Sequence, residues 1–285
     1  MTSDGDSTIT AQQQDIIRQL GVTAGFDVQA EADHRTAFLA QYLQRAGLRT
    51  FVVGVSGGVD SLVAGQLARG AVRGLRKQGY EAHVTALRLP YGIQPDEDDA
   101  LACLDVIQPD EVLTVDIQSA ADALMAGLVK QGLTFKDATH QDFILGNIKA
   151  RERMVALYAV AGAQSGLVVG TDHAAEMLTG FSTKFGDTAA DVMPLHGLNK
   201  RRVRALAQHL GAPDTLSDKV PTADLESLAP MRPDEEAFGV SYHDIDDFLE
   251  GKTISPEAHD RLLGHWRASA HKRGHAAVPA AVAEV

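Results

Sequence analysis

Short apolar runs alternate with longer segments whose apolar residues recur at helical spacing. Runs of this length with apolar residues at successive positions are typical of parallel strands buried on both faces. Four runs predict such strands: FVVGV (51–55), HVTALRL (83–89), EVLTVDI (111–117) and GLVVGT (166–171). Helices are predicted over 31–48, 61–79, 96–108 and 141–164. This alternation predicts an α/β fold: a doubly wound, mostly parallel sheet, which we expect to have five strands, with helices on both faces.

The chain reads as one domain with weakly patterned ends. Residues 1–12 are polar and are expected to form a flexible tail, and 276–285 a weakly ordered tail. Residues 13–275 are expected to form the single domain. Within it, 213–236 (PDTLSDKVPTADLESLAPMRPDEE) is rich in Pro, Asp and Ser and is a candidate mobile lid loop.

Composition narrows the class of protein. The 285 residues carry a formal net charge of −12, which argues against nucleic acid as a partner because phosphates require a basic face. The single cysteine, Cys103, excludes an intrachain disulfide, and its setting in ALACLDVI indicates a core residue. No secretory signal and no membrane-spanning run is visible, so a cytoplasmic protein without a membrane partner is expected.

The first strand ends in a glycine-rich turn that directly precedes a helix. It reads Gly54-Val55-Ser56-Gly57-Gly58-Val59-Asp60-Ser61. Glycines let backbone N–H groups converge on phosphate oxygens, and the helix adds the positive end of its dipole. The spacing fits neither GxxxxGK[ST] nor GxGxxG. The alternative is a plain strand–turn–helix with Ser as N-cap, which would not require Asp60. SGGVDS resembles the pyrophosphate loop of ATP pyrophosphatases, which bind ATP and transfer AMP to an acceptor.

A second polar turn follows the fourth strand, at Gly170-Thr171-Asp172-His173-Ala174-Ala175-Glu176. Carboxyl ends of parallel strands share one edge of the sheet, so this turn is expected beside the first. Thr171 can bond a ribose or phosphate oxygen, although helix capping is an equal alternative. Glu176 and Asp60 are candidate ligands for Mg²⁺ on a nucleotide. His173 and Glu176 have the spacing of a transition-metal pair, but no third ligand is evident.

Seven motifs follow in an order that resembles NAD+ synthetases of the ammonia-dependent type, from roughly residue 12 to 275. They are LRLPYGIQPDEDDA (87–100), GNIKARERMVALYAVAG (146–162), VVGTDHAAEMLTGFSTKFGD (168–187), LNKRRVRALAQHLGAP (198–213), VPTADLE (220–226), DDFLEGK (246–252) and AHKRG (270–274). The resemblance implies an adenine nucleotide alpha hydrolase-like, Rossmann-like fold. One departure is the run 186–191, GDTAAD, which lacks the pair of glycines usual before Asp191.

The resemblance also implies roles for individual residues. Asp60, Lys200 and Thr222 would be catalytic, and Asp60 with Glu176 would hold Mg²⁺. ATP would be bound by Gly54, Val55, Ser56, Gly57, Gly58, Val59, Asp60, Ser61, Arg88, Thr171, Lys200 and Thr222. Deamido-NAD+ would be bound by Arg151, Lys184, Asp191, His271 and Lys272. Without the family, Arg151 and Lys200 read as solvated helix faces, Thr222 as a turn residue, and His271 and Lys272 as surface.

The activity that the resemblance implies is the last step of NAD biosynthesis. ATP would adenylate deamido-NAD+, pyrophosphate would leave, and ammonia would displace AMP to give NAD+. The length leaves no room for a glutaminase domain, so ammonia is the expected nitrogen source. Relatives imply a homodimer. Two alternatives remain open from the residues: another adenylating pyrophosphatase, such as a GMP synthetase or a tRNA-modifying enzyme, and a non-catalytic nucleotide sensor.

Overall fold

The computed structural model describes residues 10–223, 225–228, 230–274 and 278. The expected tails therefore lie largely outside the described residues. Helix α1 (Ala11–Gln19) begins inside the range expected as the N-terminal tail, because Thr10 caps it by accepting a hydrogen bond from the Gln13 N–H. The C-terminal helix α12 (Pro256–Ala268) is followed by a short 3₁₀ helix, η1 (Ala270–Lys272).

A parallel sheet with strand order β3-β2-β1-β4 lies at the centre of the described chain. Its strands are β1 (Thr50–Gly54), β2 (His83–Arg88), β3 (Glu111–Thr114) and β4 (Gly166–Val169). Within the described ranges the sheet has four strands, so the expected count of five is wrong. Where a fifth strand would pair, only one bridge joins Val192 to Val169. Pro194, two residues after Val192, has no N–H for a ladder, and the chain turns there.

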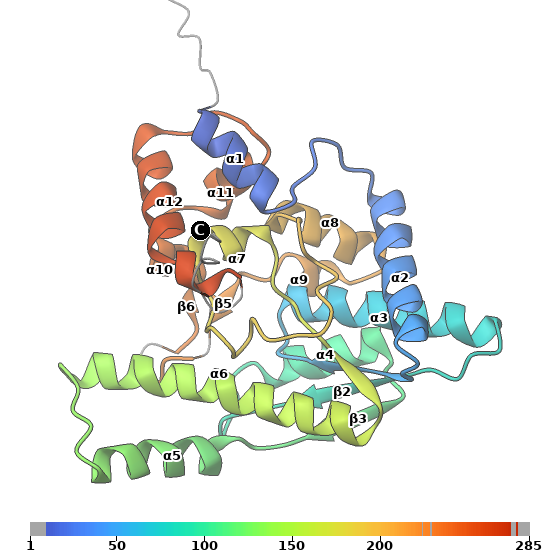
Figure 1. Ribbon diagram of the computed structural model, residues 1–285, viewed down its shortest axis with the longest axis horizontal. Helices are drawn as coiled ribbons and strands as arrows, with labels where there is room; N and C mark the ends of the chain where they lie inside the picture. The colour runs from blue at the N-terminus through green and yellow to red at the C-terminus, as the bar shows by residue number, and fades with distance from the viewer. Residues whose placement is uncertain (1–9, 224, 229, 275–277, 279–285) are drawn as a thin grey trace, which may run out of the picture.

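Helices cover both faces of this sheet, as the alternating pattern predicts (Figure 1). One face carries α2 (Val28–Arg45), α3 (Val59–Lys77), α4 (Glu97–Ile107) and α8 (Lys200–His209). The other carries α6 (Ala138–Ala163) with α5 (Gln118–Lys130) packed against it. The sequence analysis did not predict α5; its residues 118–130 are moderately apolar, and little of α5 is buried.

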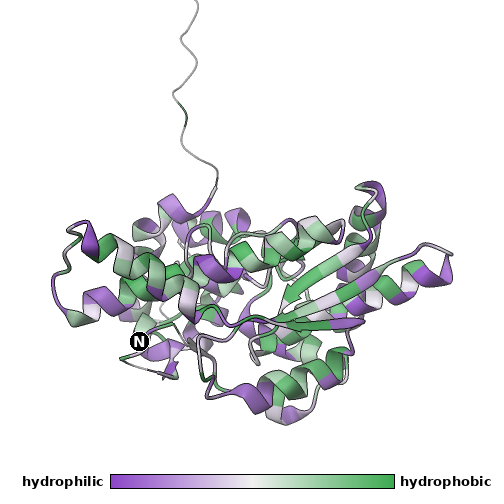
Figure 2. Ribbon diagram, turned by 90° about the horizontal axis from the view of Figure 1, so that it is seen from below, coloured by the Kyte–Doolittle hydropathy of each residue, from purple (hydrophilic) through white to green (hydrophobic). Residues whose placement is uncertain are grey.

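Alternate side chains of β1 pack on opposite faces of the sheet. Phe51 and Val53 pack with α3, whereas Val52 packs with Val168 and the apolar side of α6. Such two-sided burial explains why β1 and β4 are mainly apolar, whereas β3 at the edge of the sheet is largely exposed. Figure 2 shows the hydrophobic residues concentrated in parts of the sheet and in the helix faces against it. Cys103 is fully buried in the α3 face of the core, and burial raises the pKa of its thiol to about 12, which confirms it as a core residue.

A second cluster of helices lies beyond the carboxyl ends of the strands (Figure 1). It comprises α1, α7 (Ala174–Thr179), α10 (Asp234–Phe238), α11 (Tyr242–Leu249) and α12. Their apolar faces bury one another, with Ile16, Leu178 and Phe248 among the buried side chains. This helical cluster therefore forms one wall above the edge of the sheet where ligands bind in such folds.

The candidate lid, 213–236, contains short elements of its own. These are α9 (Asp214–Ser217), β5 (Thr222–Ala223) and β6 (Arg232–Pro233), the two strands pairing antiparallel. Two side chains of α6 hold the segment: the Lys149 ammonium donates to the Leu225 carbonyl oxygen at 3.0 Å, and Asp142 accepts from the Ser227 and Leu228 N–H groups. The segment is thus docked on α6, and its mobility stays a prediction.

Candidate active site

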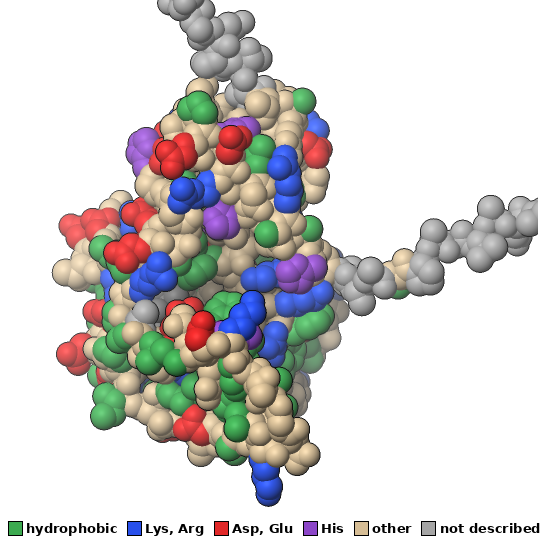
Figure 3. All heavy atoms as spheres, turned by 90° about the vertical axis from the view of Figure 1, so that its left-hand side faces the viewer, with side chains coloured by type: hydrophobic (Ala, Val, Ile, Leu, Met, Phe, Trp, Pro, Cys, Tyr) green, Lys and Arg blue, Asp and Glu red, His purple; other side chains and the backbone are tan. Residues whose placement is uncertain are grey.

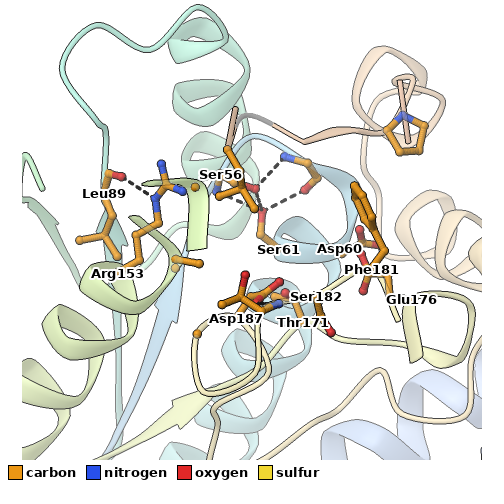
Figure 4. Close-up of a pocket in the computed structure, with 18 of the residues that line it drawn as sticks. Ser56, Asp60, Ser61, Leu89, Arg153, Thr171, Glu176, Phe181, Ser182 and Asp187 are labelled. Atoms are coloured by element: carbon orange, nitrogen blue, oxygen red, sulfur yellow. Dashed lines mark hydrogen bonds between the residues drawn. The ribbon is translucent and has the colours of Figure 1, made fainter. Parts of the chain in front are cut away.

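The carboxyl ends of β1 and β4 open onto a cavity of about 510 Å³. Its walls come from the β1–α3 turn, the loop after β4, the middle of α6 and the segment 213–236. Of the residues singled out from the sequence, the following line it: Gly54, Val55, Ser56, Gly58, Val59, Asp60, Ser61, Thr171, Glu176, Thr222 and Lys272. The two polar turns predicted to share one sheet edge therefore do meet (Figure 4).

The β1–α3 turn is built to receive an anion. Helix α3 has Gly58 as its N-cap, and no side chain caps it, so Ser is not the N-cap that the alternative interpretation required. The Ser61 hydroxyl donates to the Gly58 carbonyl oxygen at 2.9 Å, and the Ser56 N–H donates to the Ser61 oxygen at 3.3 Å, which fixes the turn. An uncapped helix start beside a cavity offers its N–H groups and dipole to a phosphate.

Of the two adjacent glycines in this turn, Gly57 is the one that cannot be substituted without strain. Its φ of +88° is a conformation that L side chains rarely adopt, and a Cβ there would lie 2.9 Å from the Ala100 backbone nitrogen of α4. Gly58 is different, because its φ is −89° and a Cβ would meet only the Ser56 hydroxyl, at 3.4 Å. The close approach of the turn to α4 therefore depends on Gly57.

A buried charge cluster lies at one end of the cavity. The Lys200 ammonium donates to Asp60 Oδ2 at 2.7 Å, and the Lys200 side chain is 1% exposed. Asn199 caps the start of α8, and Asp246 of α11 accepts from the Lys200 and Arg201 N–H groups, which anchors this lysine. Lys200 is not among the lining residues, so it stands behind Asp60 and not on the cavity wall.

The pKa values of this cluster follow from burial and neighbouring charge. Burial alone would raise the pKa of Asp60, but Lys200 and His173 together outweigh it and hold that pKa well below its usual range. Burial would lower the pKa of Lys200, yet Asp60 and Glu176 raise it. For Glu176, burial prevails and raises the pKa to about 8. The cluster thus contains a buried ion pair, Asp60–Lys200, and the Glu176 carboxyl, which ionises near neutral pH only when a further cation lies close to it.

Arg88 lies away from the cavity lining. Its guanidinium donates to Glu97 Oε1 at 2.8 Å at the start of α4. Thr171 and Thr222 do line the cavity, from the loop after β4 and from β5. The structure therefore brings the two threonines to the cavity and places Arg88 behind the turn.

The cations expected for the dinucleotide form a chain of contacts through backbone oxygens. Arg151 donates to the Lys184 carbonyl oxygen at 3.2 Å, and the Lys184 ammonium donates to the His271 carbonyl oxygen at 2.7 Å. The Lys272 ammonium donates to the Gly180 and Ser182 carbonyl oxygens. Lys184 and Lys272 also line a second cavity of about 370 Å³. Lys, Arg and His side chains flank a hollow on the face shown in Figure 3.

Asp191 has a different setting from these cations. Its Oδ2 accepts a hydrogen bond from the Val168 N–H of β4 at 2.7 Å, and Asp191 lines neither cavity. Its role toward deamido-NAD+ stays a prediction, and the contact seen here is structural.

Several charged lining residues were not singled out from the sequence: Asp96, Arg153, Asp187, Lys219, Glu226, Arg232 and Asp234. Arg153 donates to the Leu89 carbonyl oxygen at 3.0 Å, and its only signal was a place in the basic run KARER. The Lys219 ammonium lies 2.7 Å from Asp99 and 3.1 Å from Asp96, beside the Gly57 carbonyl oxygen. A lone lysine in a polar loop carries no pattern, so only the fold reveals this contact with the phosphate turn.

A parallel sheet whose first strand runs through an uncapped glycine turn into a helix, with an Asp–Lys pair beside it, defines a nucleotide-binding α/β protein of the ATP-pyrophosphatase type. Comparison with known proteins narrows the class. Residues 31–276 match the model of the NAD synthase family, and the chain belongs to that family.

Relatives of known name agree with this assignment. The chain is 56% identical over 263 residues to the NH(3)-dependent NAD(+) synthetase of Paraburkholderia phytofirmans, covering 92% of each chain. A crystal structure of NAD+ synthetase from Burkholderia pseudomallei is 54% identical, with a TM-score of 0.81 over 92% of this chain and 96% of that one. An NMN synthetase from Francisella tularensis is 37% identical, with a TM-score of 0.78 over 90% and 100%.

Proposed function

We propose that this chain is an ammonia-dependent NAD+ synthetase, a ligase that forms a C–N bond in the last step of NAD biosynthesis. A carboxylate oxygen of deamido-NAD+ attacks the α-phosphorus of ATP, and pyrophosphate leaves. Ammonia then attacks the carbonyl carbon of this NAD-adenylate, AMP leaves, and a proton is released. The observation that carries the proposal is the uncapped turn at Gly57–Ser61 opening onto a cavity, in a chain 56% identical to a named NH(3)-dependent NAD(+) synthetase.

Adenylation by this site is mainly positioning and charge stabilisation. The first N–H groups of α3 and the hydroxyls of Ser56 and Ser61 face the triphosphate, where they stabilise charge on the departing pyrophosphate. Thr171 and Thr222 border the same cavity and orient the nucleotide. Lys200 acts through Asp60, because its ammonium is bound to that carboxylate and stands behind the wall.

The donor set beside the turn fits Mg²⁺. Asp60 and Glu176 both line the cavity, and Asp60 Oδ1 has no hydrogen-bond partner among the described residues. Hard carboxylate oxygens are ligands that Mg²⁺ takes together with phosphate oxygens. Bound there with ATP, Mg²⁺ supplies neutralisation of the phosphate charge. Asp60 and Glu176 would hold it, since both carboxylates border the cavity beside the turn.

The cations Arg151, Lys184 and Lys272, with His271, are proposed to bind the dinucleotide substrate. Their ammonium and guanidinium groups donate to backbone carbonyl oxygens, and the charge of Asp187 acts on Lys272. A dinucleotide with two phosphates and a carboxylate matches such a group of cations.

A homodimer is also proposed. Helices α5 and α6 expose apolar side chains outside the cavity, among them Leu124, Leu128, Val129 and Val155. Exposed apolar side chains of this kind support an interaction surface, and the resemblance of the sequence to NAD+ synthetases implies a second copy of the chain as its partner. We expect Val155→Asp to yield monomers by sedimentation velocity, while Leu101→Asp on α4, a similarly exposed control, stays dimeric. Wild-type chain that sediments only as a fully active monomer contradicts the dimer.

None of the described helices combines the length and apolarity that crossing a bilayer requires. The net charge of −12 and the single buried cysteine support the proposal of a cytoplasmic enzyme.

The direct test is a product assay. Purified chain with ATP, Mg²⁺, ammonium and deamido-NAD+ should form NAD+, AMP and pyrophosphate in equal amounts. ADP with inorganic phosphate would overturn adenylation at the α-phosphorus. Turnover of XMP in place of deamido-NAD+ would favour another adenylating enzyme, and ATP binding without pyrophosphate release would favour a nucleotide sensor.

A second substrate merits a parallel assay. The 37% identity to an NMN synthetase over 90% of this chain favours testing the mononucleotide carboxylate, which the same chemistry would convert to NMN. We expect deamido-NAD+ to be preferred in kcat/KM by at least about tenfold, because the cations extend beyond the phosphate turn to η1. The reverse preference would assign the chain to NMN synthesis.

A further inference from the structure

The short helix η1 carries two of the residues proposed to bind the dinucleotide, His271 and Lys272. A single 3₁₀ turn has few hydrogen bonds of its own, so its position depends on groups that fasten it to the rest of the fold. None of the three residues of η1 is fully buried, so burial alone does not fix it. The side chains that hold η1 therefore decide where these two residues lie.

Arg273, directly after η1, contacts both α12 and α7. The central carbon of its guanidinium lies 3.3 Å from the centroid of the Trp266 ring on α12. Its Nη2 donates to the Trp266 carbonyl oxygen, and its Nη1 donates to the Ser269 hydroxyl oxygen at 2.6 Å and to the Met177 carbonyl oxygen of α7 at 3.3 Å. A planar guanidinium can stack on a ring and donate along its edge at the same time, which the ammonium of a lysine cannot do.

Lys272 is fastened to the same end of α7. Its ammonium donates to the carbonyl oxygens of Gly180, the C-cap of α7, at 2.8 Å and of Ser182 at 2.7 Å. The last carbonyl oxygens of a helix have no partner within the helix, and nearby cations stabilise them. Two successive cations of the chain, Lys272 and Arg273, therefore bind carbonyl oxygens at and just beyond the end of α7.

The end of α7 and the end of α12 pack too closely for η1 to take another position easily. A Cβ on Gly180 would lie 2.1 Å from the Ser269 Cβ, the residue that precedes η1. Ser269 is buried, and its hydroxyl donates to the His265 carbonyl oxygen of α12 at 2.8 Å. From this position Lys272 borders both cavities. A shift of η1 would therefore move Lys272 away from them.

We propose that Arg273 is a positioning residue for the dinucleotide substrate. Its stacked and hydrogen-bonded guanidinium fixes η1 against α7 and α12, which keeps Lys272 at the two cavities and His271 beside it. Arg273 acts through these neighbours, because both terminal nitrogens of its guanidinium already donate to protein oxygens. The inference rests on the proposed function, in which His271 and Lys272 bind deamido-NAD+, and it adds the residue that holds them in place.

Steady-state kinetics with the full-length chain separates binding of the two substrates from chemistry. Arg273→Met keeps much of the side-chain volume and removes the donors. We expect KM for deamido-NAD+ to rise about tenfold, with kcat and KM for ATP within about twofold of wild type. Arg273→Lys should recover part of the loss and show a rise of about threefold, since it keeps the charge but not the stacked fork. Arg267→Met, an exposed arginine on α12, is the matched control and should leave all three constants unchanged.

Tryptophan fluorescence reports the same contact without turnover, because Trp266 is the only tryptophan of the chain. Loss of the stacked guanidinium uncovers one face of the indole ring. We expect Arg273→Met to change the emission and to raise quenching by acrylamide, with Arg273→Lys between this variant and wild type. Circular dichroism shows whether each variant is folded.

The outcomes separate this inference from the proposed function. Changed emission in Arg273→Met with an unchanged KM for deamido-NAD+ would overturn the inference, and so would equal rises in KM for both substrates or a loss in kcat alone. If Arg273→Met does not fold, Arg273→Lys decides, and a wild-type KM for deamido-NAD+ in that variant would overturn the inference. Wild-type chain that forms no NAD+ from deamido-NAD+ overturns the proposed function itself, and this is seen before any variant is compared.

Discussion

The two sides of the site, one proposed to bind the ATP phosphates and the other the dinucleotide, are built in different ways. On the phosphate side, charged groups are paired with one another and buried, as with the Lys200 ammonium on Asp60. On the dinucleotide side, Arg151, Lys184 and Lys272 donate to backbone carbonyl oxygens, and Arg151 and Lys184 remain partly or largely exposed. The proposed phosphate side therefore holds its geometry before ligand arrives, whereas the proposed dinucleotide side holds its cations on backbone carbonyl oxygens, with Asp187 as a charged neighbour of Lys272.

The difference reflects what each ligand needs. Charge that develops on a leaving pyrophosphate is best stabilised by groups that need no reorganisation, which favours burial and fixed pairing. A large dinucleotide must enter and leave. This favours cations that donate to backbone carbonyl oxygens, because such hydrogen bonds can be replaced by bonds to ligand oxygens at a small cost in free energy. Substitutions on the phosphate side should accordingly affect catalysis and stability, and substitutions on the dinucleotide side should affect mainly KM.

The largest effect is expected from Asp60→Asn. It keeps the shape of the side chain but removes a carboxylate that pairs with Lys200 and borders the cavity. We expect kcat to fall at least about 10³-fold, as for loss of a group that stabilises transition-state charge. Circular dichroism should show a folded chain, with Asp15→Asn, exposed on α1, as control. Activity within tenfold of wild type would remove Asp60 from the catalytic machinery.

The next largest effect is a difference in stability between substitutions at Gly57 and at Gly58. Gly57→Ala should lower the free energy of unfolding by about 2 kcal/mol or more, because of its positive φ and the contact with Ala100. Gly58→Ala should cost less than about 1 kcal/mol, since its φ is ordinary and its surroundings are open. Urea unfolding measures both. Equal losses would show that the turn relaxes away from α4 and is not rigid.

A substitution at Asp246 tests the hydrogen bonds that this carboxylate accepts at the start of α8, from the Lys200 and Arg201 N–H groups. Burial raises its pKa to about 6, despite the N–H groups of Arg201 and Lys200 that lower it. Between its unfolded pKa of about 3.9 and 6, the folded state therefore holds more protons than the unfolded state, so this contribution to stability falls as pH rises. Asp246→Asn leaves one N–H poorly paired and should cost about 2 kcal/mol near pH 4.5. This gap between wild type and variant should narrow toward pH 7; a gap that widens would mean a lowered pKa.

The smallest effect is expected on the dinucleotide side. Arg151→Ala should raise KM for deamido-NAD+ about tenfold, equivalent to about 1.4 kcal/mol, with KM for ATP nearly unchanged. Arg73→Ala, an exposed arginine on α3, is the control. A rise in KM for ATP of the same size would show that the two sides are not separate, and that the comparison fails.

Local pattern was sufficient for much of the fold and for the phosphate side. The apolar runs predicted β1 to β4. For β1 and β4 the reason is burial on both faces, which needs no polar alternation, whereas β3 at the edge of the sheet is largely exposed. SGGVDS predicted the turn because its glycines and the helix start are adjacent in the chain. The prediction of a fifth strand was wrong. Only one bridge, at Val192, pairs with β4 in the described chain, and Pro194 has no N–H to continue the pairing. Helix α5 was missed because its mostly exposed surface leaves little periodic signal.

By itself the sequence located the glycine turn before the helix, and through the ordered motifs it identified the family. Tertiary structure alone decided which distant groups meet. It placed Lys200 behind Asp60, brought Lys219 to the Gly57 carbonyl oxygen, and set Asp60 beside the His173–Glu176 pair. Such contacts depend on how α3, α7 and α8 pack at the sheet edge, and no spacing along the chain encodes the angle at which separate helices meet.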